Sequence, residues 1–153
     1  MKTVIFLLFV AFLHAATINS LALGNNPGDN QTDNPAENQT DNPDKLVVLW
    51  TSDDPYVAER VAFMFTHAAK TAGWFSEVTL IIWGPSAKLA AENIKVQDKL
   101  KAMQKDGVVI EACIVCANAY GVTDILKNMD FVVKGMGSPL TGYLKSGAKV
   151  LTF

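Results

Sequence analysis

The sequence predicts a three-layer α/β/α sandwich with a mainly parallel five-stranded sheet. Five short apolar runs carry this prediction, because they are continuous rather than alternating, which is typical of strands buried on both faces of a parallel sheet. Each run is separated from the next by a segment long enough for a helical crossover, and such crossovers join parallel strands. Strands and helices therefore alternate along the chain, as they do in α/β domains. The five runs lie at residues 45–50, 78–83, 108–112, 131–133 and 149–153.

The first crossover has clear signals for the start and the end of a helix. Asp53 and Asp54 precede Pro55, so that an acidic cap is followed by a proline at the first helical position, where its missing N–H costs nothing. Gly73 is placed to end this helix. Apolar residues recur between these signals at helical spacing, and we expect their side chains to cover the sheet. They are Val57, Val61, Met64, Phe65, Ala68 and Ala72.

The later crossovers are expected to be helical as well. Residues 86–92 and 94–106 are interpreted as one broken helix or as two consecutive helices. Residues 122–128 are interpreted as a short helix, and residues 139–145 as the last one, closed by Gly147. A helix at 139–145 argues against a hairpin between the last two strands. These patterns leave the order of the strands within the sheet open.

The first 22 residues are expected to be a cleavable signal peptide. Lys2 precedes the apolar run Val4–Leu13, which is too short to span a bilayer and suits the apolar region of a signal peptide. Small residues at Ser20 and Ala22 favour cleavage after Ala22, and residues 14–16 offer a less well placed alternative. A retained N-terminal anchor is the less favoured interpretation, and no cysteine is available there for a lipoprotein. The protein is therefore expected to be exported, either periplasmic or secreted.

Residues 23–45 are expected to form a disordered linker rich in Asn, Pro and Asp. The segment Asn30–Pro35 is echoed by Asn38–Pro43, and no large apolar residue interrupts the linker after Gly24. Such a segment cannot bury enough apolar surface to offset the entropy lost on ordering. Its two Asn-Gln-Thr sequons matter only in a cell that glycosylates such sites. The remainder, residues 46–153, is expected to be one α/β domain, which is large enough to bury a single core.

The expected domain carries little net charge. From Leu46 onward the chain has 10 acidic and 11 basic residues, and the basic residues are scattered. This argues against nucleic acid as the main partner, because nucleic-acid-binding proteins present a concentrated basic surface. No membrane contact is expected after the signal peptide is removed. No cofactor is expected either. The sequence has no P-loop, no dinucleotide-binding glycine motif and no serine-esterase motif, so no motif supports nucleotide hydrolysis or serine esterase chemistry.

A functional site is expected beyond the carboxyl ends of the strands, where open parallel sheets bind their ligands. Small or turn-forming residues follow three of the expected strands, so that a ligand or a partner can approach the backbone. The third strand is followed by the two cysteines of the chain. The expected binding residues of this crevice are Thr51, Ser52 and Asp53, then Trp83, Gly84, Pro85 and Ser86, and finally Gly135, Met136 and Gly137.

Cys113 and Cys116 form a Cys-x-x-Cys pair after the third strand. A thiolate is the reactive form of cysteine, and the N-terminus of a helix lowers the pKa of a thiol placed there. Cys113 is expected to be the exposed leading thiol, and Cys116, one turn later, the more buried thiol that resolves a persulfide or a mixed disulfide. A static disulfide is one alternative. Metal binding is another, although the pair supplies only two of the four ligands of a structural zinc, and His67 is expected on a solvated helix face.

These residues resemble the DsrE/DsrF-like family of sulfur-relay proteins over essentially all of residues 46–153. The resemblance rests on Leu46–Ser52, Leu80–Leu89, Ala112–Val122 and Gly135–Leu140, of which the cysteine segment is the most specific. In the sulfur-carrying members of that family, a cysteine after the third strand accepts a persulfide, and a glycine followed by a hydrophobic residue comes eight residues later. Cys113 and Gly121–Val122 match this pattern.

The resemblance implies that Cys113 carries sulfur and that Cys116 is its companion thiol. It also implies homo-oligomers or hetero-oligomers with related subunits, commonly trimers or hexamers, and a protein that donates or accepts sulfur. This chain differs from the best understood relays of the family, which are cytoplasmic, in its expected export signal.

Three functions are compatible with the sequence. The first is a persulfide or thiol carrier that uses Cys113 together with Cys116, in which case any enzymatic activity is a sulfur transfer. The second is a non-enzymatic module that binds a small ligand or a partner, with a structural Cys113–Cys116 disulfide. The third and weakest is transient binding of a soft metal ion such as Cu(I) by the two thiolates.

Overall fold

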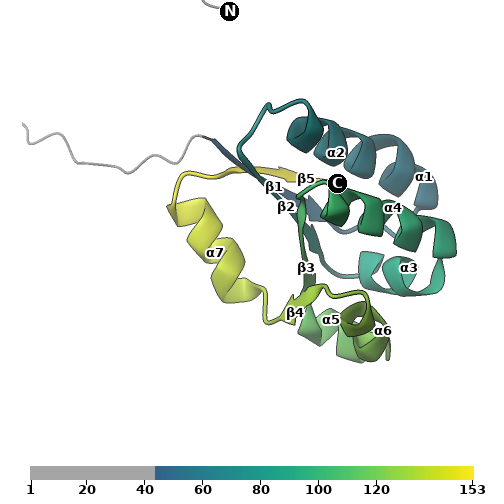
Figure 1. Ribbon diagram of the computed structural model, residues 1–153. Coiled ribbons are helices and arrows are strands. Elements are labelled where there is room, and N and C mark those ends of the chain that lie inside the picture. Colours follow the sequence, from purple (N-terminus) through teal and green to yellow (C-terminus); the bar gives the residue numbers. More distant parts are fainter. Residues whose placement is uncertain (1–43) are drawn as a thin grey trace, which may run out of the picture. The chain divides into compact units, whose positions relative to one another are not determined.

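The computed structural model describes residues 44–153, and the strands of this part form one parallel five-stranded sheet (Figure 1). The predicted α/β fold with a parallel sheet is thereby confirmed. The spatial order of the strands is β4-β3-β2-β1-β5. The expected signal peptide, and the expected linker up to residue 43, lie outside the described residues. The strands are β1 (Lys45–Trp50), β2 (Glu77–Ile82), β3 (Val109–Cys113), β4 (Val132–Lys134) and β5 (Lys149–Thr152).

The crossovers between the strands are helical. The first helix begins as predicted, since the Asp54 carboxylate accepts the backbone N–H groups of Tyr56 and Val57 and Pro55 is the first helical residue. Asn93 caps the fourth helix in the same way, so that two consecutive helices form there rather than one broken helix. In chain order the elements are α1 (Pro55–Val57), the π-helical segment η1 (Ala58–Ala62), α2 (Phe63–Thr71), α3 (Ser86–Glu92), α4 (Ile94–Lys105), α5 (Ile114–Ala119), α6 (Thr123–Asn128) and α7 (Gly137–Lys145).

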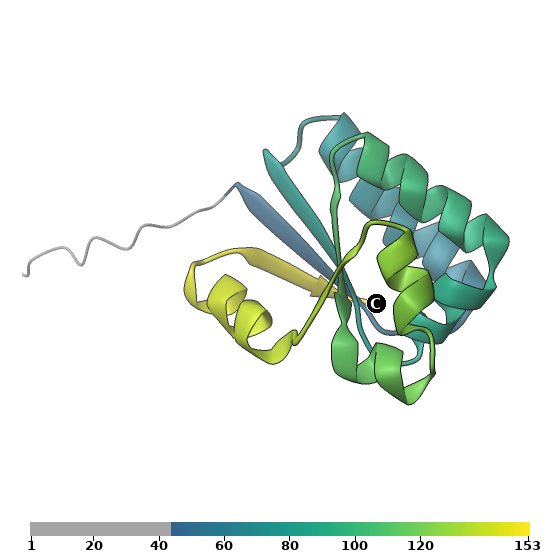
Figure 2. The same ribbon diagram turned by 60° about the horizontal axis from the view of Figure 1, so that its bottom comes forward.

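The strand order explains which face of the sheet each helix covers. The chain adds β2, β3 and β4 stepwise on one side of β1, and then returns to add β5 on the other side. Parallel crossovers are right-handed, so a reversal of direction places the connecting helix on the opposite face. Figure 2 shows this arrangement, with α7 on one side of the sheet and α1, α2 and α4 on the other. Since β4 and β5 lie at opposite edges, they do not form a hairpin.

Two apolar clusters fill the space on either side of the sheet, because side chains alternate between the faces of a strand. The larger cluster includes Leu46, Val48 and Trp50 of β1, and the Trp50 ring packs edge-on against Phe63 at a centroid distance of 4.8 Å. The smaller cluster includes Cys113, with side chains of α7 packed around it. Its buried members are Val47, Ile81, Cys113, Met136 and Ala148.

The first helix packs on the sheet through a face that the sequence analysis did not predict. The expected contact residues Val61 and Met64 are 42% and 64% exposed. The buried residues are mostly small, which lets the helix axis approach the sheet closely. In addition, the π-helical turn, in which the Phe63 N–H bonds the Ala58 carbonyl, adds a residue to one turn and shifts the helical register. The buried set is Ala58, Ala62, Phe63, Thr66 and Ala69.

The domain includes two residues that the expected boundary assigns to the linker. The Asp44 carboxylate accepts the Ser76 N–H at 3.1 Å. Lys45 opens β1, and its Nζ lies 2.8 Å from the Glu77 carboxylate.

In the part of the chain from residue 44 onward, no helix combines the length and apolarity required to cross a membrane.

The buried face of the first helix can be tested with a pair of substitutions at neighbouring positions. Ala62→Val is expected to lower the free energy of unfolding by about 1–3 kcal/mol, because two added methyl groups have no space against the sheet. Val61→Ala on the exposed side is the control and is expected to change it by no more than about 0.5 kcal/mol. Urea unfolding followed by circular dichroism measures both, and a larger loss for Val61→Ala would contradict the observed face.

Candidate functional site

A buried serine ties the carboxyl ends of β1 and β2 together. The Ser86 hydroxyl donates a hydrogen bond to the Trp50 carbonyl at 2.7 Å and accepts one from the Trp83 N–H at 3.0 Å. Ser86 is fully buried, so these bonds are shielded from water. They fix the start of the loop that follows β2.

The same loop contacts one of the two thiols. The Gly84 N–H donates a hydrogen bond to Cys116 Sγ at 3.1 Å. Gly84 has a φ of +73°, a left-handed conformation that glycine adopts without steric cost. The backbone conformation that aims this N–H at Cys116 is therefore one that favours glycine.

Cys113 ends β3 and is the residue directly before α5, while Cys116 lies in the first turn of α5. Both are free thiols in this structure. Cys113 is 4% exposed and Cys116 is half-buried, so the prediction that Cys113 is the exposed thiol and Cys116 the more buried one is wrong. The physical reason is that Met136, in the loop after β4, and the side chains of α7 pack over the end of β3.

The surroundings of the two thiols shift their pKa values in opposite directions. Burial alone raises the pKa of Cys113, but hydrogen bonds from the backbone N–H groups of Cys116, Val115 and Met136, and from the Cys116 side chain, outweigh it and hold this pKa below the usual value. Burial raises the pKa of Cys116, and the neighbouring Cys113 raises it further, although the Gly84 N–H opposes this. Of the two, Cys113 is the thiol that loses its proton first.

The structure brings only some of the expected crevice residues to the thiols. Met136 is buried beside Cys113, and Trp83 packs against the same cluster. Gly135 and Gly137 flank Met136, and a Cβ added at either position would meet no atom within 4 Å. Pro85 is exposed.

The residues that follow β1 take part in other contacts. The Thr51 hydroxyl donates to the Phe153 carbonyl at 2.9 Å, which attaches this loop to the end of the chain. The Ser52 hydroxyl accepts the Asp54 N–H at 3.1 Å. Asp53 lies at the rim of a separate hollow. Thr51 still adjoins the loop that contacts the thiols, because its carbonyl oxygen lies 4.0 Å from where a Cβ on Gly84 would be, whereas Asp53 lines that hollow.

Two hollows on the described residues are not lined by either cysteine. One, of about 650 Å³, is an open depression with two acidic and two basic side chains in its wall. The other, of about 360 Å³, lies between α2 and α4. The thiols thus sit outside both hollows. The first is lined by Asp53, Lys88, Leu89, Glu92, Asn93, Ile94 and Lys95.

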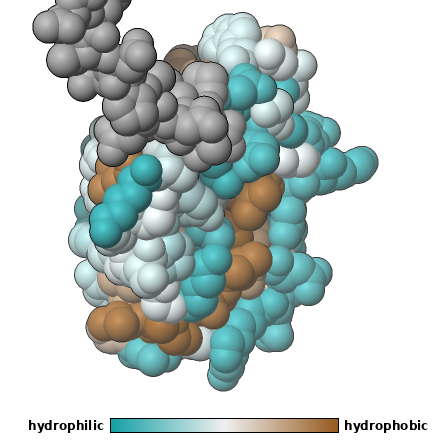
Figure 3. All heavy atoms as spheres, turned by 90° about the vertical axis from the view of Figure 1, so that its left-hand side faces the viewer, coloured by the Kyte–Doolittle hydropathy of each residue, from teal (hydrophilic) through white to brown (hydrophobic). Residues whose placement is uncertain are grey.

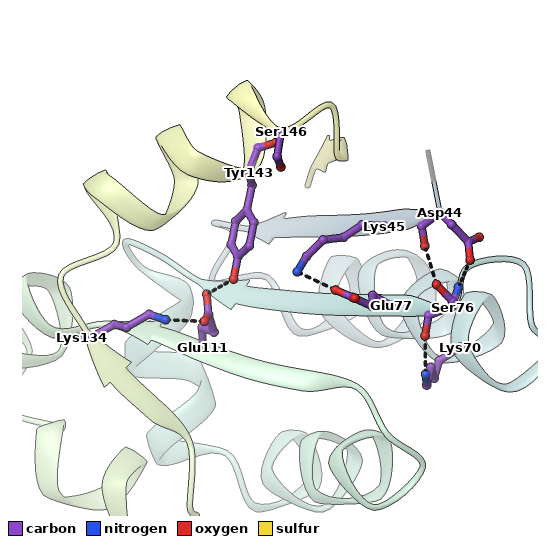
Figure 4. A network of polar contacts seen from close by, with 9 residues as sticks. All are labelled: Asp44, Lys45, Lys70, Ser76, Glu77, Glu111, Lys134, Tyr143 and Ser146. Atoms are coloured by element: carbon purple, nitrogen blue, oxygen red, sulfur yellow. Dashed lines mark hydrogen bonds and ion pairs between the residues drawn. The ribbon is translucent and has the colours of Figure 1, made fainter. Parts of the chain in front are cut away.

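Sequence reasoning missed a buried carboxylate near the thiols. Glu111 is 3% exposed, and its carboxylate lies 2.6 Å from Lys134 Nζ and accepts a hydrogen bond from the Tyr143 hydroxyl at 3.1 Å (Figure 4). Burial, together with the charge of Glu111, raises the pKa of Tyr143 to about 12. The signal in the sequence was a single glutamate inside an otherwise apolar strand, two residues before Cys113.

The described residues contain no group of three or more His, Cys, Asp or Glu side chains placed to hold a metal ion. His67 makes a surface pair with Asp106, with 2.7 Å between Nε2 and the carboxylate, and lies away from the sheet end that holds the cysteines. A metal at the thiols would have two ligands from these residue types, which is fewer than a closed zinc site requires.

Comparisons with known proteins agree with the fold. The model of the DsrE/DsrF-like family matches residues 44–153. The solved structure of BT1422, a conserved protein of unknown function from Bacteroides thetaiotaomicron, is 39% identical in sequence, with a TM-score of 0.70, and the match covers 72% of this chain and 95% of that chain. None of the curated proteins matches the chain. The chain therefore belongs to the DsrE/DsrF-like family.

Proposed function

We propose that the protein carries sulfur as a persulfide on Cys113 and that Cys116 assists its release. The observation that carries this proposal is the pair of adjacent free thiols whose pKa values are shifted in opposite directions at the carboxyl end of β3. Membership of the DsrE/DsrF-like family supports this proposal, because the family includes sulfur-relay proteins.

The loading step is a transfer of sulfane sulfur that needs no external oxidant. The Cys113 thiolate attacks the outer sulfur of a donor persulfide, R–S–SH, so that a new S–S bond forms on Cys113 and the donor leaves as the thiolate R–S⁻. Backbone N–H groups around Cys113 stabilise the attacking thiolate, since they bond the charged form.

Two routes can unload the persulfide. In the first, an acceptor thiolate attacks the outer sulfur and regenerates the Cys113 thiolate, which is the reverse of loading. In the second, the Cys116 thiolate attacks Cys113 Sγ, forms the Cys113–Cys116 disulfide and releases HS⁻; a dithiol reductant must then supply two electrons to restore the pair. The raised pKa of Cys116 makes the second route faster as the pH rises, because a larger share of Cys116 is then thiolate.

The proposal is tested by comparing the pH at which each of the two thiols reacts. In Cys116→Ser, the remaining Cys113 is expected to react with iodoacetamide at a pH below that of an ordinary thiol, whose pKa is about 8.5, because three backbone N–H groups still stabilise the thiolate. In Cys113→Ser, the remaining Cys116 is expected to react only at higher pH. Mass spectrometry after exposure to a small-molecule persulfide is expected to show one added sulfur atom in Cys116→Ser.

The Cys113→Ser variant is the matched control, because it keeps the Cys116 thiol in the first turn of α5 but should not retain added sulfur. Equal alkylation profiles for the two variants, with the pKa of an ordinary thiol, would contradict the carrier function. A native protein isolated with a Cys113–Cys116 disulfide that resists reduction would favour the binding module instead.

We also propose that the protein is exported, on the basis of the apolar run Val4–Leu13 and the change of composition near Gly24. The expected outcome is a mature chain that begins near Leu23. N-terminal sequencing of the protein recovered from the producing cell checks this, and a mature chain that still contains Val4–Leu13 would contradict it.

We further propose that the domain forms a homo-oligomer, or a hetero-oligomer with related subunits. Apolar side chains remain exposed on the edge strands and on α7, namely Val132, Leu151 and Leu144. Figure 3, seen from the side on which α7 lies, shows apolar patches between hydrophilic ones. Burial of such patches favours association, and a nearly neutral domain does not repel its copies strongly.

Light scattering on the mature chain at micromolar concentration checks the oligomeric state. A mass of three or six protomers is expected. A mass of one protomer, in the absence of any related subunit, would contradict the proposed homo-oligomer.

A further inference from the structure

A single buried carboxylate holds both ends of the chain segment that lies over Cys113. Glu111 Oε1 lies 2.6 Å from Nζ of Lys134, the last residue of β4, and Glu111 Oε2 accepts the hydroxyl of Tyr143, near the end of α7, at 3.1 Å. Figure 4 shows these two side chains reaching the carboxylate from different elements. The segment from Lys134 to Tyr143 is therefore attached to β3 at its beginning and near its end.

The middle of this segment touches the thiol. In the pairing of β3 with β4, Cys113 lies opposite Lys134, and Met136 follows two residues later. Met136 is 1% exposed and packs with Cys113 in the apolar cluster beneath α7. The Met136 N–H also helps to hold the pKa of Cys113 below its usual value.

Glu111 and Cys113 belong to the same face of the sheet. They are two residues apart on β3, and residues at that spacing point to the same side of a strand. Glu111 and Cys113 therefore lie on one short piece of β3. A displacement of the segment from Lys134 to Tyr143 changes the surroundings of both.

We propose that Glu111 is a positioning residue for Cys113: its bonds to Lys134 and Tyr143 hold the Met136 backbone against the thiol. The proposal rests on the proposed function in so far as Cys113 is taken to be the reacting group. The Glu111 carboxylate bonds Lys134 and Tyr143 rather than either sulfur, and it acts through the segment that it holds.

A positioning role and a direct effect of charge predict opposite changes in the alkylation rate of Cys113 when Glu111 is replaced. Removal of the Glu111 charge leaves Lys134 unpaired, and both changes favour a nearby thiolate, so a purely electrostatic role predicts faster alkylation of Cys113 at neutral pH. Loss of the Met136 donor predicts slower alkylation. The other charged groups near Tyr143 are Lys45, whose Nζ lies 4.7 Å from the ring centroid, and Glu77, and both are unchanged by the substitutions below.

The experiment uses the full chain with Cys116→Ser, so that Cys113 is the only thiol. Glu111→Gln and Tyr143→Phe are introduced separately into this background. Tyr143→Phe removes one hydrogen bond to the Glu111 carboxylate without changing any charge at neutral pH. Asp106→Asn is the control, because it removes a carboxylate that pairs with His67 at the opposite end of β3. The rate of iodoacetamide alkylation is measured against pH, and amide hydrogen exchange is measured for residues 135–137.

Glu111→Gln and Tyr143→Phe are expected to slow the alkylation of Cys113 at neutral pH by about three- to tenfold, since one pKa unit changes the thiolate fraction about tenfold below the pKa. Both are expected to speed amide exchange at residues 135–137, while Asp106→Asn changes neither. Tyr143→Phe keeps the test valid if Glu111→Gln does not fold.

The proposal is overturned if the folded variants alkylate at the rate of the background or faster, or if exchange at residues 135–137 is unchanged. These outcomes are distinct from a failure of the sulfur-carrier function, in which Cys113 does not retain added sulfur although Glu111 still controls its alkylation.

Discussion

Parallel pairing of β3 with both of its neighbours brings three loop starts to the same edge of the sheet, and the thiol site depends on this alignment. Cys113 stands at the end of β3, between the loop after β2, which supplies the Gly84 N–H, and the loop after β4, which supplies the Met136 N–H. An antiparallel neighbour would send its loop to the opposite edge. The two thiols are thus surrounded by backbone donors from separate crossovers, and within residues 44–153 no charged side chain forms a hydrogen bond with either sulfur.

Backbone donors and a buried carboxylate make different demands on the fold. An N–H group at a loop start is available without desolvating a charge, so it stabilises a thiolate at little cost. A carboxylate that is 3% exposed loses most of its hydration, and this loss is compensated only while Lys134 and Tyr143 both remain bonded. The arrangement is therefore sensitive to small movements of α7, because one missing partner leaves the charge poorly compensated.

The sequence was sufficient for the elements that local patterns determine. The apolar runs identified all five strands, Asp54 and Pro55 identified the start of the first helix, and the position of the cysteines after the third strand followed from the same runs. The prediction of which face of the first helix is buried was wrong. The buried residues Ala58, Ala62 and Ala69 are small, and a π-helical turn changes the spacing that the helical pattern assumes.

The parts that could not be predicted depend on contacts between distant segments. The strand order requires knowledge of where β5 returns, and no local pattern encodes it. The burial of Cys113 depends on Met136, and the role of Glu111 depends on Lys134 and Tyr143, which lie 23 and 32 residues away along the chain. A glutamate in an apolar strand shows that a partner must exist, but it does not say which residue that partner is.

The position of α7 has a consequence for how a second molecule could reach Cys113. No residue of α7 is itself buried, so this helix gives up less apolar contact on leaving the sheet than α4, which buries Val96, Leu100 and Met103. Regions with few buried apolar contacts are the ones that open most readily while the rest of a protein stays folded. Detachment of α7 also breaks the hydrogen bond from Tyr143 to Glu111, so a partner protein that reaches a thiol only 4% exposed in this way must first loosen that bond.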